Sequence, residues 1–261
     1  MAQAPRPSFP ARLTSSSPVS ALQRNKPAVP AVRPPPVSST PAMASAAVRA
    51  RMVQKLAAQG IADARVLQAL GAVERHAFVD SALVNQAYED TSLPIGLGQT
   101  ISKPSVVARM VELLLGAPAL AGKPQDRLGR VLDIGTGCGY QAAVLSHVAT
   151  EVYSIERLRG LHEKARANLR PFRLATVHLI LGDGRLGYAK GAPYAGIVAA
   201  AGGEDVPATW VEQLAVGGRI VAPMQSANGG QALVVIDKNA RGIERRMLEP
   251  VHFVPLKSGI A

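Results

Sequence analysis

Residues 131–139 read Val-Leu-Asp-Ile-Gly-Thr-Gly-Cys-Gly, an apolar run that leads directly into three alternating glycines. The apolar run predicts a buried strand, and residues 140–148 predict a helix. A strand, a glycine-rich turn and a helix place backbone N–H groups and a helix N-terminus beside a ligand. Glycine suits this turn because a Cβ atom would block the close approach of the ligand. We therefore predict a cofactor site at the loop of Gly135, Thr136 and Gly137.

Acidic residues follow the next two predicted strands. Glu156 lies 21 residues after Gly135, at a strand end where a carboxylate can accept hydrogen bonds from ribose hydroxyls. Asp183, followed by Gly184, lies at the same edge of the predicted sheet, where an acid can accept a hydrogen bond from an adenine amino group. Two alternatives remain: a glycine-rich turn without a ligand, and an Asx-type turn at Asp183.

Two cofactor classes use this arrangement of glycines and a spaced acid. A dinucleotide fingerprint has glycine or alanine at the last position of G-x-G-x-x-G/A, and here that position is Tyr140. The observed G-x-G-x-G, with Asp133 just ahead of it, resembles instead the cofactor loop of S-adenosylmethionine-dependent methyltransferases. That resemblance implies S-adenosyl-L-methionine as cofactor and adds Asp133 to the candidate cofactor-binding residues.

Beyond Gly129 the predicted strands alternate with helices. The predicted strands are residues 131–134, 151–155, 177–181, 196–200, 219–222, 233–237 and 247–254. This alternation predicts an α/β fold with a doubly wound, mostly parallel sheet, Rossmann-like in its cofactor loop. No helix separates the last two strands, which predicts an antiparallel C-terminal edge. Residues 43–128 are expected to form a helical N-terminal part, with a buried apolar helix at 106–115.

The composition distinguishes an N-terminal tail, residues 1–42, from the rest of the chain, residues 43–261. Residues 1–42 contain half of the 20 prolines and are predicted to be disordered, which leaves residues 43–261 as a single expected domain. Residues 1–50 carry six basic side chains and no acid, so this stretch contributes +6 of the net charge of +11. The serine- and arginine-rich tail also fits an organelle transit peptide; the simpler interpretations are an unspecialised tail or an over-extended start.

The composition and motifs of the chain exclude several functional classes of protein. Hydrophobic residues make up 48% and charged residues 18%, the profile of a soluble globular protein. Cys138 is the only cysteine, no apolar run reaches the length of a membrane span, and the five histidines show no metal-ligand spacing. No basic run is interleaved with aromatic residues, so we predict no nucleic-acid partner. We expect a cytoplasmic monomer without membrane or metal.

Five segments, in one order, resemble the protein-L-isoaspartate O-methyltransferases. They are residues 87–90, 93–102, 131–141, 182–184 and 251–256. The run Leu-Pro-Ile-Gly-Leu-Gly-Gln-Thr-Ile-Ser at 93–102 is the most specific, and the resemblance extends from about Met52 to the last residue. It implies methyl transfer from S-adenosylmethionine to the free α-carboxyl of isoaspartyl residues in damaged proteins and peptides. The ester then closes to a succinimide, which can reopen as aspartate.

The same resemblance assigns roles to the run at 93–102. It makes Ser102 the active-site residue and places Thr100 and Ile101 at the cofactor pocket. Ser102 precedes Pro104 at a predicted helix start, where its hydroxyl and nearby N–H groups could hold a substrate carboxylate. Its position alone fits a helix N-cap equally well. A carboxylate is already ionised near neutral pH, so its attack needs no general base.

The sequence also departs from the family. Ala195 replaces an acid, Ala200 replaces a threonine, and Gly202-Gly203 stands where the family has prolines. These departures leave open a methyltransferase with another acceptor. A different alternative is an inactive cofactor-binding module that acts through its basic tail. We expect Trp210 to serve in packing, and the basic residues of the helix after Glu156 to form a solvated surface.

Overall fold

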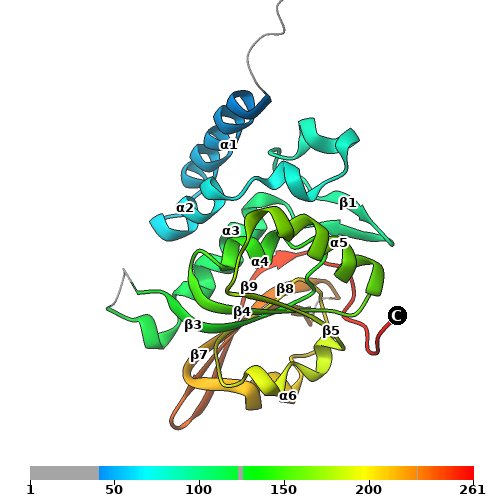
Figure 1. Ribbon diagram of the computed structural model, residues 1–261. Helices are drawn as coiled ribbons and strands as arrows, with labels where there is room; N and C mark the ends of the chain where they lie inside the picture. The colour runs from blue at the N-terminus through cyan, green and yellow to red at the C-terminus, as the bar shows by residue number, and fades with distance from the viewer. Residues whose placement is uncertain (1–40, 123–125, 228) are drawn as a thin grey trace, which may run out of the picture. The chain divides into compact units, whose positions relative to one another are not determined.

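The computed structural model describes residues 41–122, 126–227 and 229–261. Its main sheet has seven strands in the order β5-β4-β3-β6-β7-β8-β9 (Figure 1). The strands are β3 Leu128–Ile134, β4 Ala149–Glu156, β5 Val177–Leu181, β6 Tyr194–Ala199, β7 Leu214–Gln225, β8 Gln231–Asn239 and β9 Gly242–Val251. Strands β3 to β7 pair in parallel, whereas β7, β8 and β9 pair antiparallel. The predicted parallel sheet with an antiparallel C-terminal edge is confirmed.

Helices cover both faces of this sheet. The α-helices are α1 Pro41–Ala58, α2 Ala64–Ala72, α3 Pro104–Leu115, α4 Tyr140–Leu145, α5 Arg159–Leu169 and α6 Ala208–Gln213. The 3-10 helices are η1 Arg75–Phe78, η2 Ser81–Gln86, η3 Pro118–Leu120, η4 Arg170–Phe172, η5 Gly184–Leu186 and η6 Ala189–Gly191. No α-helix that the structure describes is long and apolar enough to cross a bilayer.

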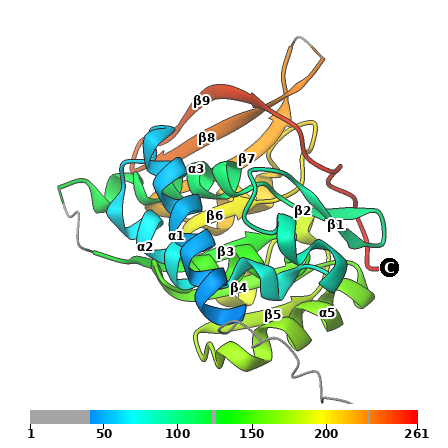
Figure 2. The ribbon, with the colours of Figure 1, turned by 90° about the horizontal axis from the view of Figure 1, so that it is seen from above.

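Alternate residues of the central strands supply two separate cores. Val131 and Val198 pack with side chains of α1 to α5. Their chain neighbours Leu132 and Ile197 face the opposite core, where Trp210 of α6 is fully buried. This alternation follows from the pleat of a strand, which turns successive side chains to opposite faces. Figure 2 shows α1, α2 and α3 lying over the sheet on one side.

Residues 93–101, within the part of the chain that was expected to be helical, form a β-hairpin. Strands β1 (Leu93–Gly96) and β2 (Gln99–Ile101) pair antiparallel outside the main sheet. The turn consists of Gly96, Leu97 and Gly98, which all have left-handed φ angles of 97°, 51° and 68°. The alternation of apolar and polar residues could not predict this hairpin, because its strands have only 4 and 3 residues. Two glycines at the turn, Gly96 and Gly98, also interrupt the pattern.

The remaining differences concern element boundaries. The helix predicted to reach residue 148 ends at Leu145, and the last strand lies at 242–251 instead of 247–254. The ends of helices and strands are less well defined than their centres. Here Val148 leaves the helix and its carbonyl accepts the Leu128 N–H of β3, and β9 begins at the tight turn in which Asn239 pairs with Gly242. Helix α1 begins at Pro41. The predicted disorder of residues 1–42 is therefore wrong for Pro41 and Ala42, and its remaining residues, 1–40, lie outside the described residues.

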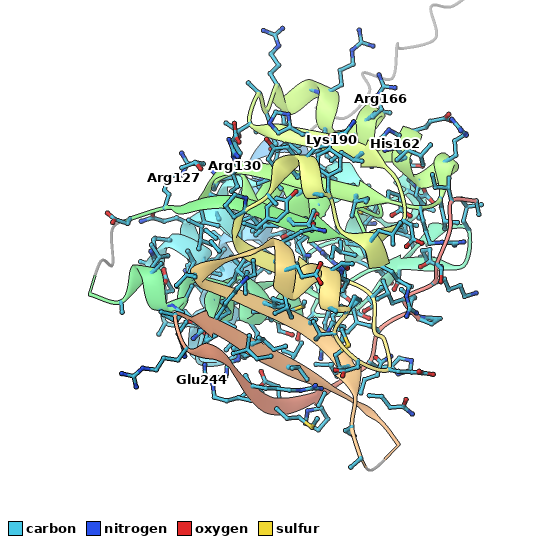
Figure 3. The ribbon with its side chains drawn as sticks, turned by 90° about the horizontal axis from the view of Figure 1, so that it is seen from below. Arg127, Arg130, His162, Arg166, Lys190 and Glu244 are labelled. Carbon is cyan, nitrogen blue, oxygen red and sulfur yellow. The ribbon has the colours of Figure 1, made fainter. Side chains whose placement is uncertain are left out.

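The basic side chains of α5 are only partly a solvated surface. Arg159, Arg166 and Arg170 are exposed, as predicted, and Figure 3 shows where Arg166 lies. Lys164 differs from the prediction, because its Nζ donates a 2.9 Å hydrogen bond to the Ile95 carbonyl of β1. It also forms a 3.0 Å ion pair with Asp80. Lys164 therefore ties the hairpin to the main sheet.

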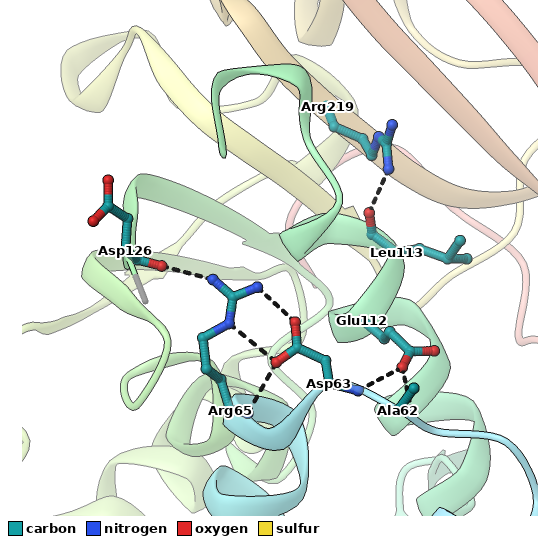
Figure 4. A network of polar contacts seen from close by, with 7 residues as sticks. All are labelled: Ala62, Asp63, Arg65, Glu112, Leu113, Asp126 and Arg219. Carbon is teal, nitrogen blue, oxygen red and sulfur yellow. Dashed lines mark hydrogen bonds and ion pairs between the residues drawn. The ribbon is translucent and has the colours of Figure 1, made fainter. Parts of the chain in front are cut away.

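A polar network joins α2 to α3 (Figure 4). The Glu112 carboxylate of α3 accepts hydrogen bonds from the backbone N–H groups of Ala62, at 2.7 Å, and Asp63, at 3.0 Å. Asp63 in turn caps α2 by accepting the Arg65 N–H. The ion pair with Arg65 holds the pKa of Asp63 below its ordinary value. The acidic side chains thus fix how the chain enters α2 beside α3.

A buried ion pair fixes α3 on the sheet. Arg219 of β7 donates a 2.8 Å hydrogen bond to the Leu113 carbonyl at the end of α3, which Figure 4 also shows. The same guanidinium binds both carboxylate oxygens of Asp237 on β8, at 2.5 and 2.8 Å. Arg219 and Asp237 are 8% and 7% exposed, so neither charge has water as an alternative partner.

Removing one partner of this pair is expected to be costly. We predict that Asp237→Ala lowers the free energy of unfolding by about 3 kcal/mol, because it leaves Arg219 charged and buried. Urea unfolding followed by circular dichroism measures the change. The matched control is Glu151→Ala, which breaks the exposed pair of Glu151 with Arg130 and should cost less than about 1 kcal/mol. Equal costs for the two variants would contradict this account.

Candidate active site

A cavity of about 360 Å³ opens at the carboxyl ends of β3, β4 and β6. Ligands of open α/β sheets bind at this edge, and sites for small molecules commonly enclose roughly 300–1,000 Å³. The lining is drawn from six parts of the chain: the β1–β2 hairpin, the glycine loop, the stretch from the end of β4 into α5, Gly184, residues 200–201 and the C-terminal segment. Of the predicted cofactor-binding residues it includes Thr100, Gly135, Gly137, Glu156 and Gly184.

The glycine loop has the backbone shape that the sequence analysis expected. Gly135, Gly137 and Gly139 have φ angles of 92°, 57° and 95°, a region that side chains other than glycine rarely adopt. A Cβ atom on Gly137 would lie 3.2 Å from Ile95 Cδ1, within the cavity wall. The glycines therefore leave space at the cavity that any other residue would fill.

Glu156 closes the loop against α5 and keeps acceptor capacity toward the cavity. Its carboxylate accepts hydrogen bonds from the N–H groups of Gly137 and Leu158, each at 2.9 Å. The residue is only 5% exposed, and its remaining exposed surface belongs to the cavity lining. Each carboxylate oxygen has a further lone pair, so Glu156 can still accept hydrogen bonds from a bound hydroxyl.

Asp133 lies beneath the loop and not in the cavity wall. It is fully buried, and its carboxylate accepts hydrogen bonds from Gln141 at 2.8 Å and Ser154 at 2.7 Å. The Ser154 hydroxyl also lies 2.7 Å from that of Thr136, which ties the loop to the carboxylate. Burial raises the pKa of Asp133 to about 6, although the two hydrogen bonds oppose that shift. The geometry gives Asp133 and Thr136 a part in holding the loop.

Both carboxylate oxygens of Asp183 accept hydrogen bonds from within the chain. One oxygen accepts the Arg185 N–H in the Asx-type turn that the sequence left open, and the other accepts the Gly259 N–H at 2.7 Å. Asp183 is outside the lining of the 360 Å³ cavity, whereas its neighbour Gly184 belongs to it. A Cβ atom on Gly184 would lie 2.6 Å from Ile134 Cγ2, so this position requires glycine.

A second groove, of about 440 Å³, lies on the other side of the hairpin. Ser102 and Lys103 line it from the chain before α3, and residues 250–254 line it from the end of β9 onward. Ser102 is not the N-cap of α3, since Lys103 takes that position. Its hydroxyl forms no hydrogen bond with any residue that the structure describes, so it is available to a ligand.

The groove and the cavity meet at three residues. Thr100, Ala200 and Val254 line both of them. Thr100 and Ala200 also line a small space of about 30 Å³, together with Ile101, Ser102 and Thr136. Two molecules bound in the groove and the cavity would therefore approach each other at Thr100 and Ala200, beside Ser102.

Sequence reasoning missed one wall of the site. Residues 254–257, at the C-terminal end of the chain, line the cofactor-sized cavity. They are held there by Gly202, whose N–H donates to the Val254 carbonyl and whose carbonyl accepts the Leu256 N–H, at 2.8 and 2.7 Å. The segment 251–256 belonged to the family resemblance, but no local pattern indicates that it folds back onto Gly202.

The buried carboxylate predicts a pH dependence of stability. Because the folded pKa of Asp133, about 6, exceeds its ordinary value of 3.8, the folded state binds the proton more tightly. This stabilisation is present below pH 4 and is lost as the pH rises through 6. Relative to Asp133→Asn, we expect the unfolding free energy of the wild type to fall by about 2 kcal/mol between pH 4 and pH 7.

Urea unfolding at several pH values measures this difference. The control is Asp126→Asn, which removes an exposed carboxylate and measures the effect of a surface charge on the same assay. A difference between Asp133→Asn and the wild type that stays constant from pH 4 to pH 7 would contradict the raised pKa of Asp133.

Comparison with known proteins places this geometry in a family. The sequence pattern of the family described as protein-L-isoaspartate(D-aspartate) O-methyltransferase (PCMT) matches residues 47–261. A protein-L-isoaspartate O-methyltransferase of Methylibium petroleiphilum is 54% identical, with 98% of each chain covered. One of Ralstonia nicotianae is 55% identical, with 83% of this chain and 70% of the relative covered.

Solved structures show the same fold. A protein-L-isoaspartate O-methyltransferase structure superposes with a TM-score of 0.71 at 28% identity, covering 81% of this chain and 67% of that one. A putative enzyme of this name from Plasmodium falciparum, in complex with S-adenosyl-L-homocysteine, has a TM-score of 0.67 at 22% identity. It covers 80% of this chain and 98% of that one. The cavity, the groove that joins it and the match over residues 47–261 lead to one conclusion: the chain belongs to the protein-L-isoaspartate(D-aspartate) O-methyltransferase family.

Proposed function

We propose that the chain transfers the methyl group of S-adenosyl-L-methionine to the free α-carboxyl of L-isoaspartyl residues in damaged proteins and peptides. The ester then closes to a succinimide, which reopens in part as aspartate, so the reaction repairs the chain. The observation that carries this proposal is the meeting of the cavity and the groove at Thr100, Ala200 and Val254. A direct transfer requires the two reacting atoms to come into contact, so the two binding sites must adjoin.

The cavity fits S-adenosylmethionine by its donors, acceptors and shape. Glu156 would accept hydrogen bonds from the ribose hydroxyls, and the left-handed glycines at 135 and 137 leave room for close approach to the loop. Gly184 and Thr100 would contact the cofactor from the two sides. When bound, the cofactor supplies an electrophilic methyl group on a sulfonium. For Asp133, Thr136 and Asp183 we propose a supporting role, because none of them lines the cofactor cavity of about 360 Å³.

The groove fits an anionic acceptor. Its lining includes Lys103 and His252 and no carboxylate, so an isoaspartyl α-carboxylate meets no like charge there. Such a carboxylate is ionised at neutral pH, and the protein needs only to align it with the methyl group. We propose that the free hydroxyl of Ser102 donates a hydrogen bond to one carboxylate oxygen and orients the other toward the transfer site.

The proposal extends to the setting of the enzyme. We infer a cytoplasmic monomer whose partners are isoaspartyl proteins and peptides, without nucleic acid or membrane. Within the domain proposed for residues 43–261, residues 43–128 would supply Ser102 and Thr100, and residues 129–261 most of the cofactor cavity. The acceptor groove draws on both parts, since residues 250–254 form one of its walls.

Two versions of one peptide test the function. Labelled S-adenosylmethionine should methylate the isoaspartyl version and leave the aspartyl version unmodified. We predict that Ser102→Ala lowers kcat by about 100-fold, the effect of removing one positioned hydrogen-bond donor at a reacting oxygen. The matched control is Ser105→Ala, which removes a hydroxyl from the first turn of α3 outside both the groove and the cavity and should retain activity.

The alternatives give different results in the same assay. Transfer without preference for the isoaspartyl version would indicate another acceptor. Cofactor binding without transfer to either version would indicate an inactive module, and deletion of residues 1–42 should then abolish its retention on anionic partners.

The cofactor side is tested at Glu156. We predict that Glu156→Gln weakens binding of S-adenosyl-L-homocysteine by at least about tenfold, measured by isothermal titration calorimetry. The amide group would turn a donor toward the N–H of Gly137 or Leu158, so the loop loses one of its hydrogen bonds. Glu163→Gln on the exposed side of α5 serves as control. Unchanged affinity in Glu156→Gln would contradict the assignment.

A further inference from the structure

One short segment forms a wall of two neighbouring grooves. Residues 250–254 line the acceptor groove of about 440 Å³. A third groove, of about 480 Å³, lies beside it over Gly202 and Gly203. His252 lines both grooves, so the path available to an extended peptide crosses the chain at His252. The position of this segment therefore determines the shape of the acceptor site.

A side chain, and not the sheet, holds the centre of this segment. The ladder between β8 and β9 ends where Gln231 pairs with Val251. Beyond that pair, the Gln231 side chain continues the ladder. Its Oε1 accepts the Phe253 N–H at 2.7 Å, and its Nε2 donates to the Phe253 carbonyl at 3.3 Å. One amide thus supplies both hydrogen bonds that a neighbouring strand residue would otherwise make.

The cofactor side of the segment has its own support. The Gly202 backbone binds the Val254 carbonyl and the Leu256 N–H, and the stretch after Val254 lines the cofactor cavity. The two supports therefore act on different residues. Gln231 holds Phe253, which lines the acceptor groove and not the cofactor cavity, whereas Gly202 holds Val254, which lines both sites, and Leu256, which lines the cofactor cavity.

Gly202 also gives Gln231 its space. A Cβ atom at position 202 would overlap the amide of Gln231, with Nε2 as the nearest atom. The φ angle of Gly202 is not in the left-handed region, so its backbone shape alone would accept any residue. The absence of a side chain at this position, one of the departures from the family pattern, matters because the Gln231 amide occupies that volume.

We propose that Gln231 is a positioning residue for acceptor binding. Its amide fixes Phe253, and through Phe253 it fixes His252 at the junction of the two grooves. It touches neither reacting group, so its removal weakens binding of the peptide and leaves cofactor binding intact. This inference rests on the proposed function, because it assigns the groove beside Ser102 to an isoaspartyl peptide.

Steady-state kinetics on the full-length protein test this role. Gln231→Met keeps the volume of the side chain and removes both hydrogen bonds. We expect it to raise KM for the isoaspartyl peptide about tenfold, the effect of one or two lost neutral hydrogen bonds. We expect kcat and the Kd for S-adenosyl-L-homocysteine to change by less than about twofold. Thermal unfolding verifies that the variant is folded.

A second glutamine provides a matched control. Gln213, at the end of α6, makes the same kind of contact, since its amide accepts the Tyr188 N–H and donates to the Leu186 carbonyl. It lines none of the three cavities. Gln213→Met should therefore leave KM for the peptide unchanged even if it lowers stability.

A substitution at Gly202 provides a second way to remove the contact between the Gln231 amide and Phe253. Gly202→Ala should also raise KM for the peptide, because its methyl group pushes the Gln231 amide away from Phe253. In a Gln231→Ala background the amide is absent, and Gly202→Ala should add little. Independent, multiplicative effects of the two substitutions would contradict a shared mechanism.

The wild type is assayed first, which separates the two possible failures. A wild type that methylates no isoaspartyl peptide overturns the proposed function and this inference together. An active wild type with an unchanged peptide KM in Gln231→Met overturns only the positioning role. An equal loss of peptide and cofactor affinity in Gln231→Met also overturns it, since that result would indicate general loosening of the segment.

Discussion

A methyl group passes directly between two bound molecules only where their binding sites adjoin, and the residues that line both sites here are Thr100, Ala200 and Val254. The geometry of the site depends on the positions of Thr100 and Ala200 relative to each other. Ala200 follows the central strand β6, whereas Thr100 lies in the β1–β2 hairpin outside the main sheet. The constraint is therefore that a peripheral hairpin must hold a fixed position against the centre of the sheet.

Three supports, each from a different part of the chain, meet this constraint. Lys164 of α5 binds the Ile95 carbonyl of the hairpin, and Arg219 fixes the end of α3, the helix that follows Ser102. Beneath the glycine loop, the buried carboxylate of Asp133 holds Gln141 and, through Ser154, Thr136. A buried charge is an expensive way to fix a loop, and the raised pKa of Asp133 is the sign of that cost.

The parts of this site that could be predicted from the sequence are those that a local pattern of residues specifies. The apolar run before Gly135 specifies a strand and the loop that follows it, and the acid 21 residues later, Glu156, marks the edge of the cavity. Side-chain direction was not predictable: Asp133 looks like a cofactor ligand in the motif, yet its carboxylate lies below the loop. The same holds for Asp183, because its partner Gly259 is distant in sequence. The wall made by residues 254–257 was missed for the same reason, since its pairing with Gly202 is a tertiary contact.

A crystal structure of the protein with S-adenosyl-L-homocysteine and an isoaspartyl peptide would show directly whether the two bound molecules meet at Thr100 and Ala200. We predict that the sulfur of the bound product lies at these two residues. We also predict the isoaspartyl carboxylate within hydrogen-bonding distance of the Ser102 hydroxyl, in the groove that Lys103 and His252 line. A sulfur directed away from Thr100 and Ala200, or a peptide bound outside the groove, would contradict the proposed function.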